Sequence, residues 1–259
     1  MLNIEQINID DFDRVFVIGD VHGCVSHVQF LAKELNVGKN DLILGVGDVI
    51  DRKPTSFETL EYFTETPYVK SALGNHEWFA IRAMLYHDRS AFHSWYMHGG
   101  EWIDEHDDND IAELLIKAEA QMPITFQINI GKKRIAITHA GIPDNDFKNL
   151  RKPSQKQCSE AMLPENFELE EREPVKNTDL CIHGHFTLDQ PSLFGNQLYI
   201  DTGCWMDIGQ EDTRYLTVVE ITKERASVFG IKQTPSTRTP FMVMDEVTSI
   251  TQSINQILY

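Results

Sequence analysis

Three short apolar runs in this chain, rich in β-branched residues, are each followed at once by a polar motif. Residues 15–18 precede Gly-Asp-Val-His-Gly at 19–23, residues 42–46 precede Gly-Asp-Val-Ile-Asp-Arg at 47–52, and residues 135–137 precede Thr-His-Ala-Gly at 138–141. Such runs are typical of buried parallel strands. Because ligand sites of open α/β sheets form at the carboxyl ends of strands, we expect these motifs to gather at one edge of one sheet.

Strand and helix patterns alternate in the first half of the chain, whereas the second half is mostly strands. Strands are expected at 14–19, 42–47 and 68–73, each followed by a helix, with further helices at 92–97 and 111–120. Later strands are expected at 124–130, 134–139, 180–183, 198–201, 215–222 and 226–231. This order predicts an α/β fold of two packed sheets with helices on their outer faces.

Two segments stand apart from this pattern. Residues 144–177 are polar and irregular, and we interpret them as an insertion over the site. We expect one main domain over residues 1–232 and, over 233–259, a linker that leads to an amphipathic helix with Val247, Ile250, Ile254, Ile257 and Leu258 on one face.

The charge balance excludes some partners. With 23 Lys and Arg against 40 Asp and Glu, the net charge is −17, which argues against nucleic acid and leaves phosphate attraction to local cations. No apolar run approaches the roughly 20 residues of a membrane helix, so no membrane partner is expected. The acidic N-terminus lacks a signal-peptide pattern, and the four cysteines are scattered. A cytoplasmic protein with free thiols is therefore expected.

The polar motifs, together with Gly-Asn-His-Glu at 74–77 and His-Gly-His at 183–185, offer ligands for a pair of divalent metals. Asp20 and His22, two residues apart, can face one metal, and the carboxylate of Asp48 can bridge two. The amide oxygen of Asn75 suits the second metal. Imidazole nitrogens come from His139 and His185. Two metals that share a carboxylate would hold a hydroxide for in-line attack on phosphorus.

Neighbouring residues suggest how a phosphate ester would be cleaved. His76, adjacent to Asn75, is placed to protonate the leaving group, and Asp51 can keep it cationic. Arg52 can bind phosphate oxygens through two hydrogen bonds, and Lys53 is a second candidate cation. Taken singly, each motif has a plain alternative as a turn, a helix cap or a structural histidine. Their joint occurrence after strands favours chemistry.

The order of the five motifs resembles the phosphoprotein phosphatase branch of the calcineurin-like metallophosphoesterases, in particular the small bacterial and bacteriophage-lambda-type Ser/Thr phosphatases. The resemblance covers roughly residues 14–222 and includes the stretches 98–102 and 122–124. It implies a four-layer sandwich of two mixed sheets flanked by helices, a manganese pair (or iron and zinc), and a phosphorylated protein or peptide as substrate, with residues 1–232 as the catalytic domain.

The resemblance also assigns residues. It places Asp20, His22 and Asp48 on one metal, Asp48, Asn75, His139 and His185 on the other, Asp51 and His76 as the acid pair, and Arg52 on phosphate. The ligand position of His-Gly-His is His185, so His183 is predicted not to be a ligand.

Three positions depart from the pattern. Leu73 and Lys53 stand where Arg and Gly are usual, and residues 158–166 lack an expected arginine, for which Arg151 or Arg172 could substitute. A symmetrical diadenosine tetraphosphatase is the alternative, because residues 139–142 and 201–204 resemble that class. Glu77 and the short insertion oppose it. An inactive binding module is a more remote alternative, which the intact ligand set opposes.

Overall fold

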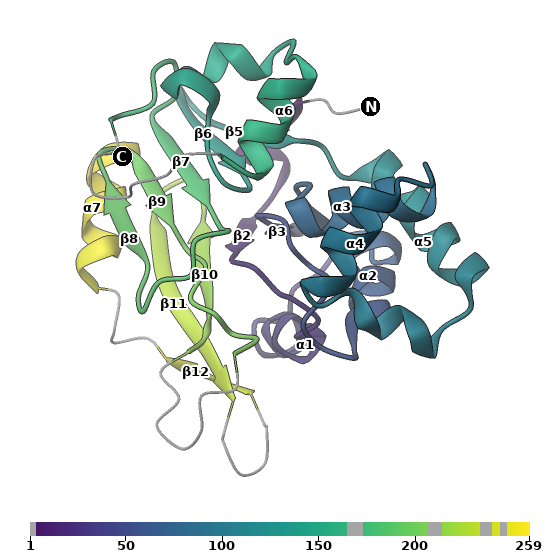
Figure 1. The fold of residues 1–259 in the computed structure, drawn as a ribbon. Coiled ribbons are helices and arrows are strands. Elements are labelled where there is room, and N and C mark those ends of the chain that lie inside the picture. Colours follow the sequence, from purple (N-terminus) through teal and green to yellow (C-terminus); the bar gives the residue numbers. More distant parts are fainter. Residues whose placement is uncertain (1–3, 165–172, 207–213, 234–239, 244–247) are drawn as a thin grey trace.

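The computed structural model describes residues 4–164, 173–206, 214–233, 240–243 and 248–259, and its strands form two six-stranded sheets (Figure 1). The β2 sheet has the order β12 (Pro240–Val243), β11 (Ala226–Gln233), β10 (Leu216–Ile221), β2 (Arg14–Ile18), β3 (Asp41–Gly45) and β4 (Val69–Ser71). The β6 sheet has the order β1 (Ile4–Asn8), β5 (Thr125–Ile130), β6 (Lys133–Thr138), β7 (Leu180–His183), β9 (Gln197–Tyr199) and β8 (Ser192–Phe194).

Both sheets are mixed. Strands β2, β3 and β4 run parallel, as do β6, β7 and β9, whereas β10, β11 and β12 are antiparallel neighbours. Helices α1 (Val25–Glu34), α2 (Ser56–Glu65), α3 (Asn75–Met84), α4 (Arg89–Met97) and α5 (Asp108–Gln121) gather on one side of the sheets in Figure 1. Helix α6 (Gln155–Met162) lies over the β6 sheet, and α7 (Thr248–Leu258) ends the chain. Short 3₁₀ segments occupy Ile9–Asp11, Gly100–Glu105, Pro143–Asn145 and Phe147–Leu150.

Strand β2 shows why the apolar runs are continuous rather than alternating. Val15 and Val17 belong to the core between the two sheets, while Phe16 and Ile18 belong to the core under the helices. Both faces of the strand are therefore covered at positions 15–18, which are all apolar. The expected arrangement of two mixed sheets flanked by helices is confirmed.

The structure differs from the expected elements in several places, and strands β8 and β12 were not expected. Strand β1 was not expected either. Helix α4 begins at Arg89, earlier than expected, because the Asp88 carboxylate accepts from the backbone N–H groups of Ser90 and Ala91. Within the supposedly irregular insertion, α6 begins after Ser154, whose hydroxyl accepts from Gln157 N.

The tail makes contacts with the rest of the molecule. Strand β12 pairs with β11, and α7 contributes Ile254 and Leu258 to the core between the sheets. Residues 234–239 and 244–247, which include part of the expected linker and Val247, lie outside the described residues. The division of the chain at 232/233 stays a prediction.

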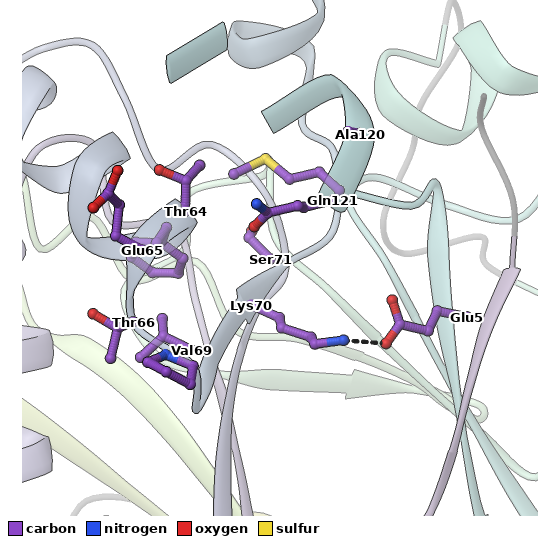
Figure 2. A pocket seen from close by; sticks show the side chains of 12 residues that line it. Glu5, Thr64, Glu65, Thr66, Val69, Lys70, Ser71, Ala120 and Gln121 are labelled. Carbon is purple, nitrogen blue, oxygen red and sulfur yellow. Dashed lines mark hydrogen bonds and ion pairs between the residues drawn. The ribbon is translucent and has the colours of Figure 1, made fainter. Parts of the chain in front are cut away.

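The edge strands β1 and β4 face a common cavity of about 380 Å³ (Figure 2). Lys70 on β4 forms an ion pair with Glu5 on β1, which links the edges of the two sheets. This cavity contains none of the predicted site residues. Among the described helices, none is both long and apolar enough to cross a membrane.

Candidate metal centre

The predicted ligands lie shortly after strands of both sheets, in loops or, for Asn75, at the first residue of α3. Asp20, Asp48 and Asn75 follow β2, β3 and β4, whereas His139 and His185 follow β6 and β7. The expectation that one sheet supplies them all is wrong, because β6 pairs with β5 and β7 and not with the β2 sheet. The site lies where strand ends of the two sheets meet.

Asp48 is shared by two groups of possible ligand atoms. One group is His22, Asp48 and His76, and the other is Asp48, His139 and His185. The Oδ2 atom of Asp48 lies 3.7 Å from Nε2 of His22 and 3.2 Å from Nε2 of His139. A carboxylate between two sets of nitrogens has the placement expected of a bridging ligand.

Hydrogen bonds fix which ring nitrogen of each histidine carries a proton. Nδ1 of His22 lies 2.7 Å from the carbonyl oxygen of Ile50, and Nδ1 of His139 lies 3.2 Å from that of Val46. Because a carbonyl oxygen only accepts, both Nδ1 atoms donate, and the lone pairs are left on Nε2. Metal-binding histidines usually have this arrangement, in which one ring nitrogen donates to a carbonyl oxygen and the other is free to bind the metal.

Several acceptors converge around Asn75. Its Oδ1 atom lies 2.9 Å from Nε2 of His139 and 2.9 Å from Nδ1 of His185. With the Asp48 carboxylate 3.2 Å from the same His139 nitrogen, lone pairs face one another. A bound cation is what satisfies such a set, so these residues fit a divalent metal.

Asp20 is the least satisfied carboxylate of the site. Its Oδ2 accepts from the backbone N–H of His185 at 3.0 Å, and its buried Oδ1 has no hydrogen-bond partner among the described residues. Burial, with the nearby charges of Asp201 and Asp48, raises the pKa of Asp20 well above its usual range. A bound cation would offset the cost of burying the Asp20 charge. Asp20 nevertheless belongs to neither group of possible ligands, and His76 is the third member of the group with His22 and Asp48.

The imidazoles of the site differ in charge. Burial, reinforced by the charge of His76, lowers the pKa of His22 to about 3. Burial, reinforced by His139, lowers the pKa of His185 to about 4. Both rings are thus neutral at neutral pH, as metal ligands must be.

His76 has the opposite character. Burial works against its charged form, but the carboxylates of Asp48 and Asp51 outweigh burial and raise the pKa of His76 to about 9. Its Nδ1 lies 2.5 Å from Oδ2 of Asp51. The other oxygen of Asp51 accepts from the indole N–H groups of Trp95 and Trp102, at 2.9 and 2.7 Å. The structure therefore brings the predicted acid pair together and adds two tryptophans that had no predicted role, although Trp102 lies in one of the stretches that the resemblance includes.

Glu77 is a second residue whose role the sequence did not reveal. Its fully buried carboxylate accepts from the backbone N–H groups of Asp48, Val49, Ile50 and Gly74, at 2.8–3.2 Å. The first turn of α3 is thereby tied to the loop that carries Asp48. Since Asp48 has a left-handed backbone (φ 51°), this loop needs such support.

A cavity of about 370 Å³ opens onto these residues. It is lined by His22, Asp48, Arg52, Asn75, His76, Phe79, Ser94, Trp95, His98, Leu163, His185, Thr187, Asp201 and Trp205. Arg52 lines it, whereas Lys53 is not among the lining residues, and binding of phosphate by Arg52 stays a prediction. Leu73 is buried in the core, Arg151 is exposed away from the lining, and Arg172 lies outside the described residues.

His183 belongs to neither group of possible ligands. Its Nδ1 donates to the carbonyl oxygen of Thr138 at 2.8 Å, and its ring lies 5.1 Å from that of Tyr199. The residue is fully buried. These contacts give His183 a packing role, in keeping with its predicted exclusion from the metal centre.

A cavity lined by His76, Arg52 and members of both groups of possible metal ligands is typical of a metal-dependent phosphoesterase. The chain belongs to the calcineurin-like phosphoesterase family, whose sequence profile matches residues 13–214. It is 33% identical to serine/threonine-protein phosphatase 2 of Salmonella typhimurium, over 78% of this chain and 93% of that relative. It is 30% identical to serine/threonine-protein phosphatase 2 of Escherichia coli, over 77% of this chain and 91% of that relative.

Other similarities are more limited. A symmetrical bis(5'-nucleosyl)-tetraphosphatase of a Shewanella species is 30% identical, over 54% of this chain and 49% of that relative. Among solved structures, a putative diadenosine tetraphosphatase matches with a TM-score of 0.63 at 16% identity, over 89% of this chain and 98% of that chain. At that identity the match shows the shared fold alone.

Proposed function

We propose that this chain is a phosphoprotein phosphatase that removes phosphate from serine and threonine residues, with two divalent metal ions, manganese in the first instance. Asp20, His22 and Asp48 would hold one ion, and Asp48, Asn75, His139 and His185 the other. Bound ions of this kind lower the pKa of coordinated water and neutralise phosphate charge. The observation that carries the proposal is the position of Asp48 in both ligand groups, beside the His76–Asp51 pair.

The His76–Asp51 pair supports an alkyl ester as substrate. The departing alkoxide of serine or threonine is strongly basic and needs a proton as the bond to phosphorus breaks. His76 is held cationic by Asp51, and its Nε2 faces the ligand cluster, 3.8 Å from Oδ2 of Asp48. In the proposed reaction His76 gives the leaving oxygen this proton, while Arg52 binds the phosphate oxygens.

The small number of cations argues against diadenosine tetraphosphate, the alternative. Within the described residues, Arg52 is the one lysine or arginine that lines the cavity. A tetraphosphate carries more charge than a phosphomonoester and a nucleotide leaving group needs less help from an acid. The net charge of −17 adds long-range repulsion for a polyanion.

The proposal is tested by comparing kcat/KM for a phosphothreonine peptide and for diadenosine tetraphosphate, with the enzyme loaded with manganese. We expect the peptide to be preferred. A preference of a hundredfold or more for the dinucleotide would make the alternative correct. Metal content per chain, measured on the same preparation, tests whether two ions bind. We further propose a cytoplasmic location, where Cys24, Cys158, Cys181 and Cys204, all free in the structure, would stay reduced.

A further inference from the structure

The backbone of Arg52 is held in a defined conformation, whereas its side chain is exposed. Its backbone is left-handed (φ 71°), and its N–H donates to the carbonyl oxygen of Gly99 at 3.1 Å. A side chain at Gly99, itself at φ 110°, would lie 2.7 Å from that Arg52 nitrogen. The side chain of Arg52 is exposed, so its long stem would otherwise move freely.

One aromatic ring lies against this side chain. The guanidinium carbon of Arg52 is 4.9 Å from the centre of the Trp205 ring, within the range of a cation–π contact. The same indole lies 5.3 Å from the His22 ring, at 75° to it. Trp205 therefore lies between Arg52, which lines the cavity, and His22, a candidate metal ligand.

The segment that carries Trp205 is attached to the metal centre. The thiol of Cys204 lies 3.2 Å from the carbonyl oxygen of Asp20, to which it donates, and the thiol of Cys24 donates to the carbonyl oxygen of Cys204. Gly203 N donates to the Asp201 carboxylate at 2.8 Å. The hydrogen bonds of Cys204 therefore fix the position of the neighbouring indole relative to the loop that carries Asp20 and His22.

We propose that Trp205 is a positioning residue that holds the guanidinium of Arg52 in place for the phosphoryl group of the substrate. Stacking occupies the flat face of the guanidinium and leaves the N–H groups at its edge free to bind two phosphate oxygens. Because a side chain that is already ordered loses less freedom on binding, the stack strengthens phosphate binding. The inference rests on the proposed function only in requiring that the cavity binds a phosphoryl group.

A double-mutant cycle separates this role from general packing. Trp205→Leu, Arg52→Ala and the double variant are compared with the wild type, all loaded with manganese. The readouts are the inhibition constant of inorganic phosphate, and kcat and KM for a phosphothreonine peptide. A cation–π contact at an exposed site corresponds to a change of about two- to fivefold. We expect Trp205→Leu to weaken phosphate binding by this factor and to raise KM equally, with kcat nearly unchanged.

The coupling between the two residues decides the question. In the Arg52→Ala background, Trp205→Leu should add no further loss of phosphate binding. Trp205→Phe, which keeps an aromatic face, should bind phosphate more tightly than Trp205→Leu does. Equal losses in both backgrounds would overturn the inference, as would a loss of bound metal in Trp205→Leu, since Trp205 would then act through His22. If Trp205→Leu does not fold, Trp205→Met takes its place in the cycle.

Inorganic phosphate makes the outcome independent of substrate identity. Coupling of Trp205 and Arg52 in phosphate inhibition, measured with an aryl phosphate as reporter, would support the inference even if phosphopeptides were not cleaved. Coupling without phosphopeptide cleavage would refute the proposed phosphoprotein substrate and leave the role of Trp205 intact. Cleavage of phosphopeptides without coupling would refute the role of Trp205 alone.

Discussion

The Nδ1 atom of His76 lies 2.5 Å from Oδ2 of Asp51, in a pair that is almost entirely shielded from solvent. The second oxygen of Asp51 is held by the indole N–H groups of Trp95 and Trp102. The carboxylate therefore cannot rotate without breaking three contacts. Its orientation fixes the His76 ring, whose Nε2 faces Asp48.

Replacing His76 should affect substrates according to their leaving groups. A general acid contributes about 10²–10⁴-fold to rate. His76→Asn should therefore lower kcat in that range for a phosphoserine peptide and much less for an aryl phosphate, whose leaving group needs little protonation. Steady-state kinetics on both substrates measures the difference. Equal losses would mean that His76 positions the substrate and does not protonate it.

Replacing Asp51 should move the pH profile. An acid acts only while protonated, so activity toward the peptide is present below the pKa of His76 and falls as the pH rises through it. The charge of Asp48 raises that pKa, and the hydrogen bond and charge of Asp51 raise it further. Asp51→Asn should therefore shift the alkaline limb of kcat to lower pH. An aryl phosphate is the control, because its limb should move less. An unchanged limb for the peptide would contradict the pairing.

Removing metal should abolish turnover. Chelation is expected to eliminate hydrolysis of an aryl phosphate, and manganese should restore it. In the proposed mechanism the nucleophile is water activated by the metal ions, so their removal removes the nucleophile. Asp48→Asn should lose most activity and reduce the metal content, since Asp48 belongs to both ligand groups. Asp108→Asn, an exposed substitution at the start of α5, is the matched control. Near-normal turnover of metal-stripped Asp48→Asn would refute a metal mechanism.

Replacing Glu77 should lower the stability of the fold. Glu77→Gln removes the charge and places the side-chain NH₂ group against backbone N–H groups that now donate to the carboxylate. We expect this to lower the free energy of unfolding by about 3 kcal/mol. For a protein of this size, that corresponds to a fall in Tm of about 10 °C. Thermal unfolding checks this, with the exposed Glu113→Gln as control. Equal Tm values for both variants would show that the four hydrogen bonds of Glu77 contribute little.

His183→Phe should keep the metal stoichiometry of the wild type. The ring donates to Thr138 and packs against Tyr199, so the substitution removes one buried hydrogen bond, at a cost of about 1 kcal/mol. Metal content per chain is the measurement. Loss of one ion per chain would make His183 a ligand after all.

The sequence was most informative where short-range patterns determine structure. The apolar runs of β2, β3 and β6 predicted the strands, and the polar motifs predicted six of the residues that line the cavity: His22, Asp48, Arg52, Asn75, His76 and His185. A buried strand fixes where its next residues lie. Helix α6 and the start of α4 had readable signals as well, in Ser154 with Gln157 and in Asp88. Those signals were overlooked because the surrounding residues are polar.

Other features depend on contacts between distant residues. Trp102 is 51 residues from Asp51, and Trp205 is farther still from Arg52. Trp102 lies in the stretch 98–102 that the resemblance includes, but no local pattern shows which residue either tryptophan contacts. The assignment of the ligands to two sheets was missed for a similar reason, since strand pairing is decided by the packing of the whole chain and not by the motif that follows a strand.

The candidate ligand residues of the two sheets meet at the metal centre, so an ion bound there would add a further link between two sheets that already share an apolar core. Binding confined to the folded state adds RT ln(1 + [M]/Kd) to its stability. Starvation for the metal would therefore reduce the lifetime of the protein as well as its turnover, because an opened sandwich is what a protease degrades. The amount of this phosphatase in a cell would follow the supply of its ion.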